Sequence, residues 1–314
     1  MIIITGGAGF IGSNIVKRLN AAGVTDILVV DDLEDGRKIF NLAGCDLVDY
    51  LDKDDFLARI NAGEKIATGI QAVLHQGACT DTTEWDGRFM MRENFEYSKC
   101  LLKFCLERRI PLVYASSASV YGVGNEFIVD RRCEYPINAY AFSKLMFDQY
   151  IRRFLPDPGS PVVGLRYFNV YGPGEQHKGG MASVIYHFHQ QLVTGDQVKL
   201  FEGSGGYGDG EQCRDFIHVD DVAAVNLWLL DHPDCSGIYN LGTGQSCTFN
   251  AVAEAVIRWH GHGRIKYIPF PERLKDSYQH FTEADISGLR TVGYSDEFQT
   301  IEAGVKHYLD AISG

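Results

Sequence analysis

The N-terminal stretch constrains the fold of this chain more than any other. Ile2 to Thr5 is an apolar run typical of a buried parallel strand, and the glycine pattern G-x-x-G-x-x-G at Gly6, Gly9 and Gly12 follows it directly. Ser13 to Ala22 then has the pattern of an amphipathic helix. Glycines allow a tight turn close to a pyrophosphate, and the helix N-terminus supplies N–H donors and the positive end of a dipole. This stretch therefore predicts a dinucleotide-binding unit.

Strand-like and helix-like segments alternate through the first half of the chain. We expect strands at residues 26–30, 45–48, 71–75, 112–115 and 161–167, and helices at 52–61, 85–109 and 181–194, together with one that begins near Asn138. This pattern predicts an α/β fold, a doubly wound parallel sheet of the Rossmann-like type with a smaller, interleaved C-terminal substrate lobe. We expect residues 1–170 to form the dinucleotide-binding domain, with 214–221 and 238–242 returning to the main sheet within a completing segment of about 214–245. Residues 171–213 and 246–314 would form the substrate lobe.

The second strand ends in Asp31 and Asp32, which bears on the choice of cofactor. A carboxylate at this point normally accepts from an adenosine ribose hydroxyl and favours NAD. Lys38 and Lys53 could instead pair with the 2′-phosphate of NADP, or they could be ordinary solvated lysines. The residues alone leave these alternatives open.

Tyr140 and Lys144 form the candidate acid–base pair. They are four residues apart in a helix-like segment, so they share one face, and a nearby ammonium would favour the tyrosine phenolate. Ser117 follows the strand at 112–115, and ligands of open parallel sheets bind at the carboxyl ends of strands. The sequence thus predicts that Ser117 and Tyr140 meet. The same spacing of Tyr and Lys also occurs on solvated helix faces.

The charge of the chain limits its partners. The formal net charge is −12 and no long basic run occurs, which argues against nucleic acid or an anionic membrane as the main partner. The chain starts in an apolar strand without a basic leader or a membrane-length apolar segment, so we expect a cytoplasmic protein. Eight cysteines lack C-x-x-C spacing, and the histidine pairs at 187/189 and 260/262 point apart on a helix, so no metal site is expected.

With the glycine motif, Ser117, Tyr140-x-x-x-Lys144 and Arg214-Asp215-Phe216 in order, the chain resembles an extended short-chain dehydrogenase/reductase that acts on nucleotide sugars, over nearly its whole length. More narrowly, four segments resemble the ADP-L-glycero-D-manno-heptose 6-epimerase family: 77–79, 82–87, 177–183 and 200–204. The loop from Ser204 to Arg214 is longer than expected for that family. The resemblance implies an isomerase of carbohydrate metabolism, in the biosynthesis of the lipopolysaccharide core, with several subunits such as a pentamer.

The resemblance also implies site residues. Those implied for NADP, with NAD as the alternative, are Gly6, Gly9, Phe10, Ile11, Gly12, Asp31, Asp32, Lys38, Lys53, His75, Gln76, Gly77, Ala78, Cys79, Asn94, Lys144 and Val170. Those implied for the ADP-heptose substrate are Ser117, Asn169, Gly180, His187, Phe201, Glu202, Gly203, Ser204, Arg214 and Tyr278. The implied catalytic residues are Tyr140, Lys178, Ser117 and Lys144.

Three other functions compete with the 6-epimerase. Another nucleotide-sugar epimerase, such as a UDP-hexose 4-epimerase, is the main alternative. A 4,6-dehydratase would resemble enzymes with an Asp-Glu pair after the catalytic hydroxyl residue, whereas Ala118 and Ser119 follow Ser117 here. A dinucleotide-sensing regulatory protein would keep the fold without the reaction, and the joint presence of Ser117, Tyr140 and Lys144 argues against it.

Overall fold

The computed structural model describes residues 1–155, 158–272 and 278–313. The chain divides into two compact units, each built from separate stretches of sequence. Unit 1 comprises Met1–Val120, Pro136–Arg166 and Val222–Tyr239, and unit 2 comprises Tyr121–Tyr135, Tyr167–Asp221 and Asn240–Gly314.

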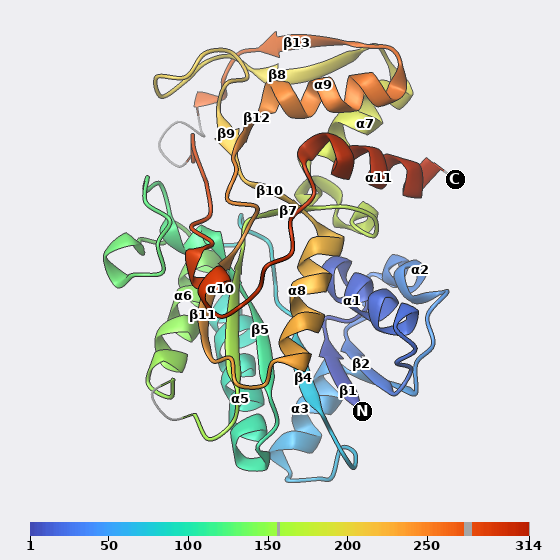
Figure 1. The fold of residues 1–314 in the computed structure, drawn as a ribbon, viewed down its shortest axis with the longest axis vertical. Coiled ribbons are helices and arrows are strands. Elements are labelled where there is room, and N and C mark those ends of the chain that lie inside the picture. Colours follow the sequence, from blue (N-terminus) through green and yellow to red (C-terminus); the bar gives the residue numbers. More distant parts are fainter. Residues whose placement is uncertain (156–157, 273–277, 314) are drawn as a thin grey trace. The chain divides into compact units, whose positions relative to one another are not determined.

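Unit 1 is organised around a seven-stranded sheet (Figure 1). Its strand order is β11-β6-β5-β4-β1-β2-β3, and the order turns at β1, which pairs in parallel with both β2 and β4. The strands are β1 (Ile2–Thr5), β2 (Ile27–Asp31), β3 (Asp49–Asp52), β4 (Ala72–His75), β5 (Leu112–Ser117), β6 (Val162–Tyr167) and β11 (Gly237–Leu241). Helices cover both faces of this sheet, which confirms the predicted doubly wound α/β fold.

The helices of unit 1 divide between the two faces of the sheet. α1 and α8 lie on one face, and α3, α5 and α6 lie on the other (Figure 1). The bounds are α1 (Phe10–Ala21), α2 (Ile39–Leu42), α3 (Lys53–Asn61), α4 (Gly87–Met90), α5 (Tyr97–Arg108), α6 (Ala139–Arg152) and α8 (Val219–Asp231). Strands β1, β2 and β4 are buried along their whole length, as apolar strands sandwiched between helices must be.

Two predicted elements of unit 1 differ from the structure. The third strand lies at Asp49–Asp52 rather than at 45–48, because the edge strand needs pairing on one side only and a polar segment can supply it. The helix predicted at 85–109 starts at Gly87 and is interrupted by a π-helical segment, Met91–Glu96, between α4 and α5.

Unit 2 is built from two-stranded sheets and three longer helices. β8 pairs in parallel with β13, β7 in parallel with β10, and β9 antiparallel with β12. The strands are β7 (Asn169–Tyr171), β8 (Gln197–Phe201), β9 (Cys213–Arg214), β10 (Phe216–His218), β12 (Cys247–Thr248) and β13 (Arg264–Ile268). The helices are α7 (Val184–Thr194), α9 (Phe249–His260), α10 (Ser287–Thr291) and α11 (Ile301–Ser313).

The core of unit 2 is apolar and comes from the facing sides of α7, α9 and α11 together with β8; it includes Phe188, Leu200, Val256 and Leu309. The prediction that residues 214–221 return to the main sheet is wrong. Arg214 and Phe216 lie in strands that pair with β12 and β7 instead, which places the segment in a small sheet of unit 2. In the described part of the chain, no helix is long and apolar enough to cross a bilayer.

Candidate functional site

The glycine-rich turn after β1 has the close backbone packing that a dinucleotide site requires. Gly6 has a φ of +66°, and a Cβ there would lie 2.5 Å from the backbone nitrogen of Gly77. A Cβ at Gly12 would collide with the carbonyl oxygen of Gly6. α1 therefore starts directly against the turn, and it has no acidic residue in its first turn to occupy its N-terminal donors.

Asp31 closes this turn from the end of β2. Its Oδ2 accepts hydrogen bonds from the backbone N–H groups of Ala8, at 2.8 Å, and Gly9, at 3.2 Å. Lys38 Nζ lies 3.0 Å from Asp31 Oδ1 and 2.8 Å from Asp32 Oδ1. Burial opposes the charge of Lys38, but the hydrogen bonds and charges of Asp32 and Asp31 outweigh it and raise the lysine pKa. Lys38 is thus a charged group at the end of β2.

Lys53 lies close to the same carboxylates. Its Nζ is 2.6 Å from Glu93 Oε2 and 4.0 Å from Asp32 Oδ2. Burial again opposes the charge of Lys53, and Glu93 raises its pKa overall. The structure therefore brings both predicted phosphate-binding lysines to Asp32.

Asn94 ties the loop after β4 to helix α6. It is buried; its Oδ1 accepts from Cys79 N at 2.8 Å, and its Nδ2 donates to Cys79 O at 2.9 Å and to Ser143 Oγ at 3.0 Å. Its place in the π-helical segment fits the tendency of such wide turns to occur at functional sites. Asn94 therefore positions the backbone of the predicted cofactor segment.

The side chains that begin this segment point into unit 1. His75 is buried between Thr5 Oγ1, at 2.6 Å, and Ser98 Oγ, at 2.8 Å, and burial lowers its pKa to about 3. Gln76 Nε2 donates to Asn226 Oδ1 at 3.2 Å. His75 is therefore a neutral core histidine, and a cofactor contact in this segment would come from backbone or from the following small residues.

Ser117 and Tyr140 meet, as the sequence predicts. Tyr140 is half-buried on α6; burial raises the pKa of its phenol, and a hydrogen bond with Ser117 opposes that rise. The expected lowering of the pKa by Lys144 is not seen, because burial dominates. Lys144 Nζ lies 5.9 Å from the centroid of the Tyr140 ring and donates to Ala115 O at 2.8 Å.

Lys144 itself is buried, and burial lowers its pKa to about 8. The bond to Ala115 fixes its ammonium at the end of β5. A lysine held in this way is suited to holding a ribose and to adding positive charge beside the phenol.

A buried network locks α6 onto the sheet. Asp148 accepts from Tyr114 Oη and Ser116 Oγ of β5 and from Arg166 Nε of β6, each at 2.9 Å, and Arg166 Nη2 is also 2.9 Å away. Asp148 and Arg166 are fully buried. The network fixes the helix that carries Tyr140 to the strand that carries Ser117. Sequence analysis missed it, although an arginine within an apolar strand is a signal for a buried acidic partner.

Several predicted residues lie in unit 2. Asn169 and Val170 are in β7, where Asn169 N donates to Asp215 O at 3.0 Å. Gly180 is exposed, and His187 lies partly buried on α7. Lys178 lies in the 3-10 segment Gln176–Met181, which is kinked directly after it at Gly179, where φ is 55° and ψ is −124°. Burial lowers the Lys178 pKa, against the opposing charge of Glu175.

Arg214 is a buried cation of unit 2. Its guanidinium lies 4.9 Å from the ring centroid of Tyr278 and 5.6 Å from that of Phe249, and Nη1 donates to Cys213 O at 2.9 Å. Burial lowers its pKa. Among the partners that the structure gives it no carboxylate occurs, so Arg214 is suited to an anionic ligand.

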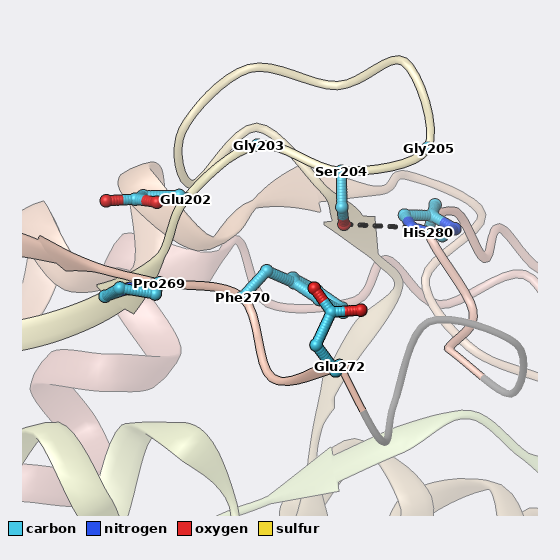
Figure 2. Close-up of a pocket in the computed structure, with 8 residues that line it drawn as sticks. All are labelled: Glu202, Gly203, Ser204, Gly205, Pro269, Phe270, Glu272 and His280. Carbon is cyan, nitrogen blue, oxygen red and sulfur yellow. Dashed lines mark hydrogen bonds between the residues drawn. The ribbon is translucent and has the colours of Figure 1, made fainter.

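A cavity of about 520 Å³ opens in unit 2 (Figure 2). It is lined by Glu202, Gly203, Ser204, Gly205, Pro269, Phe270, Glu272 and His280. A smaller cavity of about 270 Å³ shares His280 and Gly205 with it and includes Tyr207 and Tyr278. Three of the predicted substrate residues, Glu202, Gly203 and Ser204, therefore line one cavity. No sequence motif points to Phe270 or to His280, although His280 lies two positions after the predicted substrate residue Tyr278.

A second buried carboxylate, Asp215, organises unit 2. It accepts from Thr243 N and Thr243 Oγ1, both at 2.7 Å, from Gly244 N at 2.9 Å and from Ala284 N at 3.0 Å. Burial raises the Asp215 pKa, and these hydrogen bonds oppose the rise.

His218, Asp220 and His307 bring possible ligand atoms within 4.8 Å of one another. The two imidazole rings are stacked, with centroids 4.9 Å apart and planes 16° apart. A metal ion lies in the plane of each histidine that binds it, and nearly parallel rings do not share such a point. His218 Nδ1 also accepts from Asp220 N at 3.2 Å, so the arrangement is that of a packed pair.

Comparison with known proteins defines the class. Residues 2–242 match the NAD dependent epimerase/dehydratase family. The chain is 60% identical over 313 residues to the ADP-L-glycero-D-manno-heptose-6-epimerase of Alkalilimnicola ehrlichii, covering 100% of this chain and 98% of that protein. The chain therefore belongs to the NAD dependent epimerase/dehydratase family and, within it, to the family of ADP-L-glycero-D-manno-heptose-6-epimerases, as its sequence motifs predict.

Solved structures agree with this assignment. The Helicobacter pylori ADP-L-glycero-D-manno-heptose-6-epimerase has a TM-score of 0.86 at 30% identity, covering 99% of this chain and 96% of that one. The Thermus thermophilus UDP-glucose 4-epimerase in complex with NAD has a TM-score of 0.80 at 28% identity. The match covers 100% of this chain and 99% of that one. The predictions of an epimerase and of a nicotinamide cofactor are confirmed.

Proposed function

We propose that this enzyme inverts C6 of ADP-D-glycero-D-manno-heptose to give ADP-L-glycero-D-manno-heptose, using bound NADP. The observation that carries the proposal is the identity of 60% over the full chain to an enzyme of that name. It favours this function over a UDP-hexose 4-epimerase, since the UDP-glucose 4-epimerase of Thermus thermophilus is 28% identical.

The glycine-rich turn and α1 fit a dinucleotide, because the absence of a Cβ at Gly6 and Gly12 lets the turn pack against Gly77 and against its own backbone, so that α1 begins directly at the turn. When bound, the nicotinamide would accept a hydride from C6 of the substrate and return it to the opposite face. Unit 1 would hold the dinucleotide, and residues of unit 2 would hold the sugar nucleotide. This assignment keeps the predicted roles of a dinucleotide-binding domain and a substrate lobe, although residues 121–135 and 167–170 belong to unit 2 and the segment that completes unit 1 is 222–239.

Tyr140 would act as an acid–base group, with Ser117 donating a hydrogen bond to the reacting oxygen and Lys144 supplying charge. The raised pKa of Tyr140 means that the phenol needs further positive charge nearby before it can lose its proton and act as a base, and Lys144 is the nearest cation on its own helix. Lys178 would be the second acid–base group, because the ketone presents its oxygen differently after turning, and its lowered pKa favours the neutral amine.

Turnover tests this function directly. The purified enzyme is incubated with ADP-D-glycero-D-manno-heptose and with a panel of UDP-, dTDP- and GDP-sugars, and NMR identifies the products. We expect epimerisation at C6 of the ADP-heptose alone. Tyr140→Phe should abolish turnover with the fold and cofactor content retained, because it removes one hydroxyl and keeps the ring. A normal rate in Tyr140→Phe would mean that this residue is structural.

We propose NADP as the cofactor because Lys38 and Lys53 both reach Asp32, so a 2′-phosphate there would meet two ammonium groups. Protein purified without added cofactor should release NADP(H) on denaturation, identified by mass spectrometry, since a cofactor that left in mid-cycle would abort the reaction. The choice of NADP would be contradicted if the purified protein carried no cofactor and bound NAD⁺ at least as tightly as NADP⁺.

Two further predictions from the sequence stay proposals. We propose that the enzyme assembles into several subunits, such as a pentamer, and that it acts in the cytoplasm. Sedimentation of the purified protein tests the assembly, and fractionation of cells that produce it tests the location.

A further inference from the structure

Glu175 of unit 2 is a buried carboxylate that the proposed mechanism does not use. Its side chain is fully buried, and it directly precedes the 3-10 segment that carries Lys178. A carboxylate is rarely buried completely unless other groups replace its hydration. Burial raises the Glu175 pKa, and hydrogen bonds with Ser183 and the charge of Lys178 oppose that rise. The contacts of this carboxylate therefore show what it holds together.

The carboxylate joins the two ends of the Lys178 loop, residues 172–183. Its Oε1 accepts a hydrogen bond from Gly172 N at 3.4 Å, directly after β7, and one from Ser183 Oγ at 2.6 Å. Its Oε2 accepts from Ser183 N at 2.5 Å. Ser183 also caps the N-terminus of α7, because its Oγ accepts from Tyr186 N at 3.3 Å. One side chain thus connects β7 with α7, the two regular elements between which the Lys178 loop runs.

The backbone of the loop is fixed as well. Lys178 N donates to Glu175 O at 2.9 Å, and the chain turns directly after Lys178 at Gly179, which has a φ of +55°. Gly172, at the start of the loop, has a φ of +144°, in the region that favours glycine. The position of Lys178 therefore depends on Glu175 twice, through its carbonyl oxygen and through its carboxylate.

We propose that Glu175 is the positioning residue for Lys178, because its carboxylate holds both ends of the loop that carries this lysine. The inference rests on the proposed function, in which Lys178 is the second acid–base group. An acid–base group must be held within about 0.5 Å of its productive position, and a loop is less precise than a helix or strand unless other contacts fix it. The hydrogen bonds of Glu175 to Gly172 and Ser183 supply those contacts.

The charge of Glu175 has a second effect on Lys178. Burial lowers the Lys178 pKa, and the charge of Glu175 opposes that shift. A group that both takes and returns a proton works best with a pKa near the working pH, so Glu175 keeps the buried lysine able to hold a proton. Tyr308 of α11 also faces the carboxylate. Burial and the charge of Glu175 raise the pKa of its phenol, which therefore stays neutral.

Glu175→Gln tests the role of the carboxylate, because it keeps the length of the side chain and removes the charge. The amide has one acceptor oxygen instead of two, so the Lys178 loop loses part of its attachment. With ADP-D-glycero-D-manno-heptose, kcat should fall at least about tenfold, while KM and cofactor content stay within about twofold. Hydrogen–deuterium exchange of residues 172–183 should become at least about tenfold faster, because fewer bonds hold them.

Glu283→Gln is the matched control. Glu283 Oε2 also accepts from the N and the Oγ of one serine, Ser246, at 3.0 Å and 2.9 Å, and both residues lie outside the Lys178 loop. This variant should leave kcat and the exchange of residues 172–183 within about twofold of the unchanged enzyme.

The pH profile of kcat separates an effect on Lys178 from a general loosening of unit 2. The limb of the profile that disappears in Lys178→Met belongs to this lysine. Because the charge of Glu175 raises the Lys178 pKa, Glu175→Gln should move that limb to lower pH. Ser183→Ala removes one donor to the carboxylate and leaves its charge, so it should slow turnover without moving the limb.

The outcomes distinguish this inference from the proposed function. If the unchanged enzyme epimerises the ADP-heptose and Glu175→Gln does so at a normal rate, the inference fails alone. Faster exchange in Glu175→Gln with an unmoved limb would show that Glu175 is merely structural, which also overturns the inference. If the unchanged enzyme leaves the ADP-heptose unaltered, the proposed function fails, and the exchange measurement, which needs no substrate, still decides whether Glu175 holds the Lys178 loop.

Discussion

The two units each hold their candidate residues around a buried carboxylate, but the two carboxylates are satisfied differently. In unit 1, Asp148 accepts from three side chains on β5 and β6, one of them the guanidinium of Arg166. In unit 2, Asp215 accepts from backbone N–H groups and one hydroxyl, all of them neutral.

This difference determines what each carboxylate fixes. Side-chain bonds to Asp148 fix one regular element to another, so the angle between α6 and β5 is set where Tyr140 and Ser117 meet. Backbone bonds to Asp215 instead fix the course of loops around Thr243 and Ala284. In unit 1 a buried ion pair therefore fixes one regular element to another, whereas in unit 2 hydrogen bonds from backbone to Asp215 fix the loops.

Arg166→Met should have the largest effect and tests the charge pairing of unit 1. It leaves Asp148 buried without its cation, which should lower the free energy of unfolding by about 3–5 kcal/mol in urea titration. Arg18→Met, which removes an exposed arginine from α1, is the control and should change it by less than about 0.5 kcal/mol. A loss below about 1 kcal/mol for Arg166→Met would show that the neutral donors alone satisfy Asp148.

Lys178→Met should have the second-largest effect, and it tests what unit 2 contributes to the reaction. Epimerisation should slow at least about 100-fold with cofactor content retained, because Lys178 is the proposed second acid–base group. Lys144→Ala should also lower cofactor content, since Lys144 is bonded to β5 of unit 1, which we propose holds the dinucleotide. Turnover of Lys178→Met within a few-fold of the unchanged enzyme would leave Tyr140 as the acid–base residue.

Asp215→Asn should have the smallest effect, about 1–2 kcal/mol at pH 7, because the new amide presents its own donors to backbone N–H groups. The effect should also depend on pH. Burial raises the folded-state pKa of Asp215, so its contribution to stability is largest at low pH and falls as pH rises through that pKa. The advantage of the unchanged enzyme over Asp215→Asn should therefore shrink as the pH rises above about 4, the ordinary pKa of an aspartate, in urea titrations. If the difference in the free energy of unfolding between the two proteins stays constant with pH, the raised pKa of Asp215 is contradicted.

The sequence predicts features that depend on short spacings. The turn at Gly6 to Gly12 and the meeting of Ser117 with Tyr140 follow from local pattern and from the rule for strand ends. Asp148 and Arg166 could not be paired in this way, because two strands and a helix must first come together. The edge strand β3 was misplaced because pairing on one side leaves it without the apolar pattern of the inner strands.

The π-helical segment between α4 and α5 has a consequence for how these helices face their surroundings. An α-helix turns by about 100° per residue, so the wide turn at Met91–Glu96 changes the rotational phase of α5 relative to α4. Neighbouring side chains of the segment consequently serve opposite sides: Glu93 pairs with Lys53, while Asn94 reaches Cys79 and Ser143. Removing one residue here would restore an unbroken helix, and the two contacts could no longer be made together.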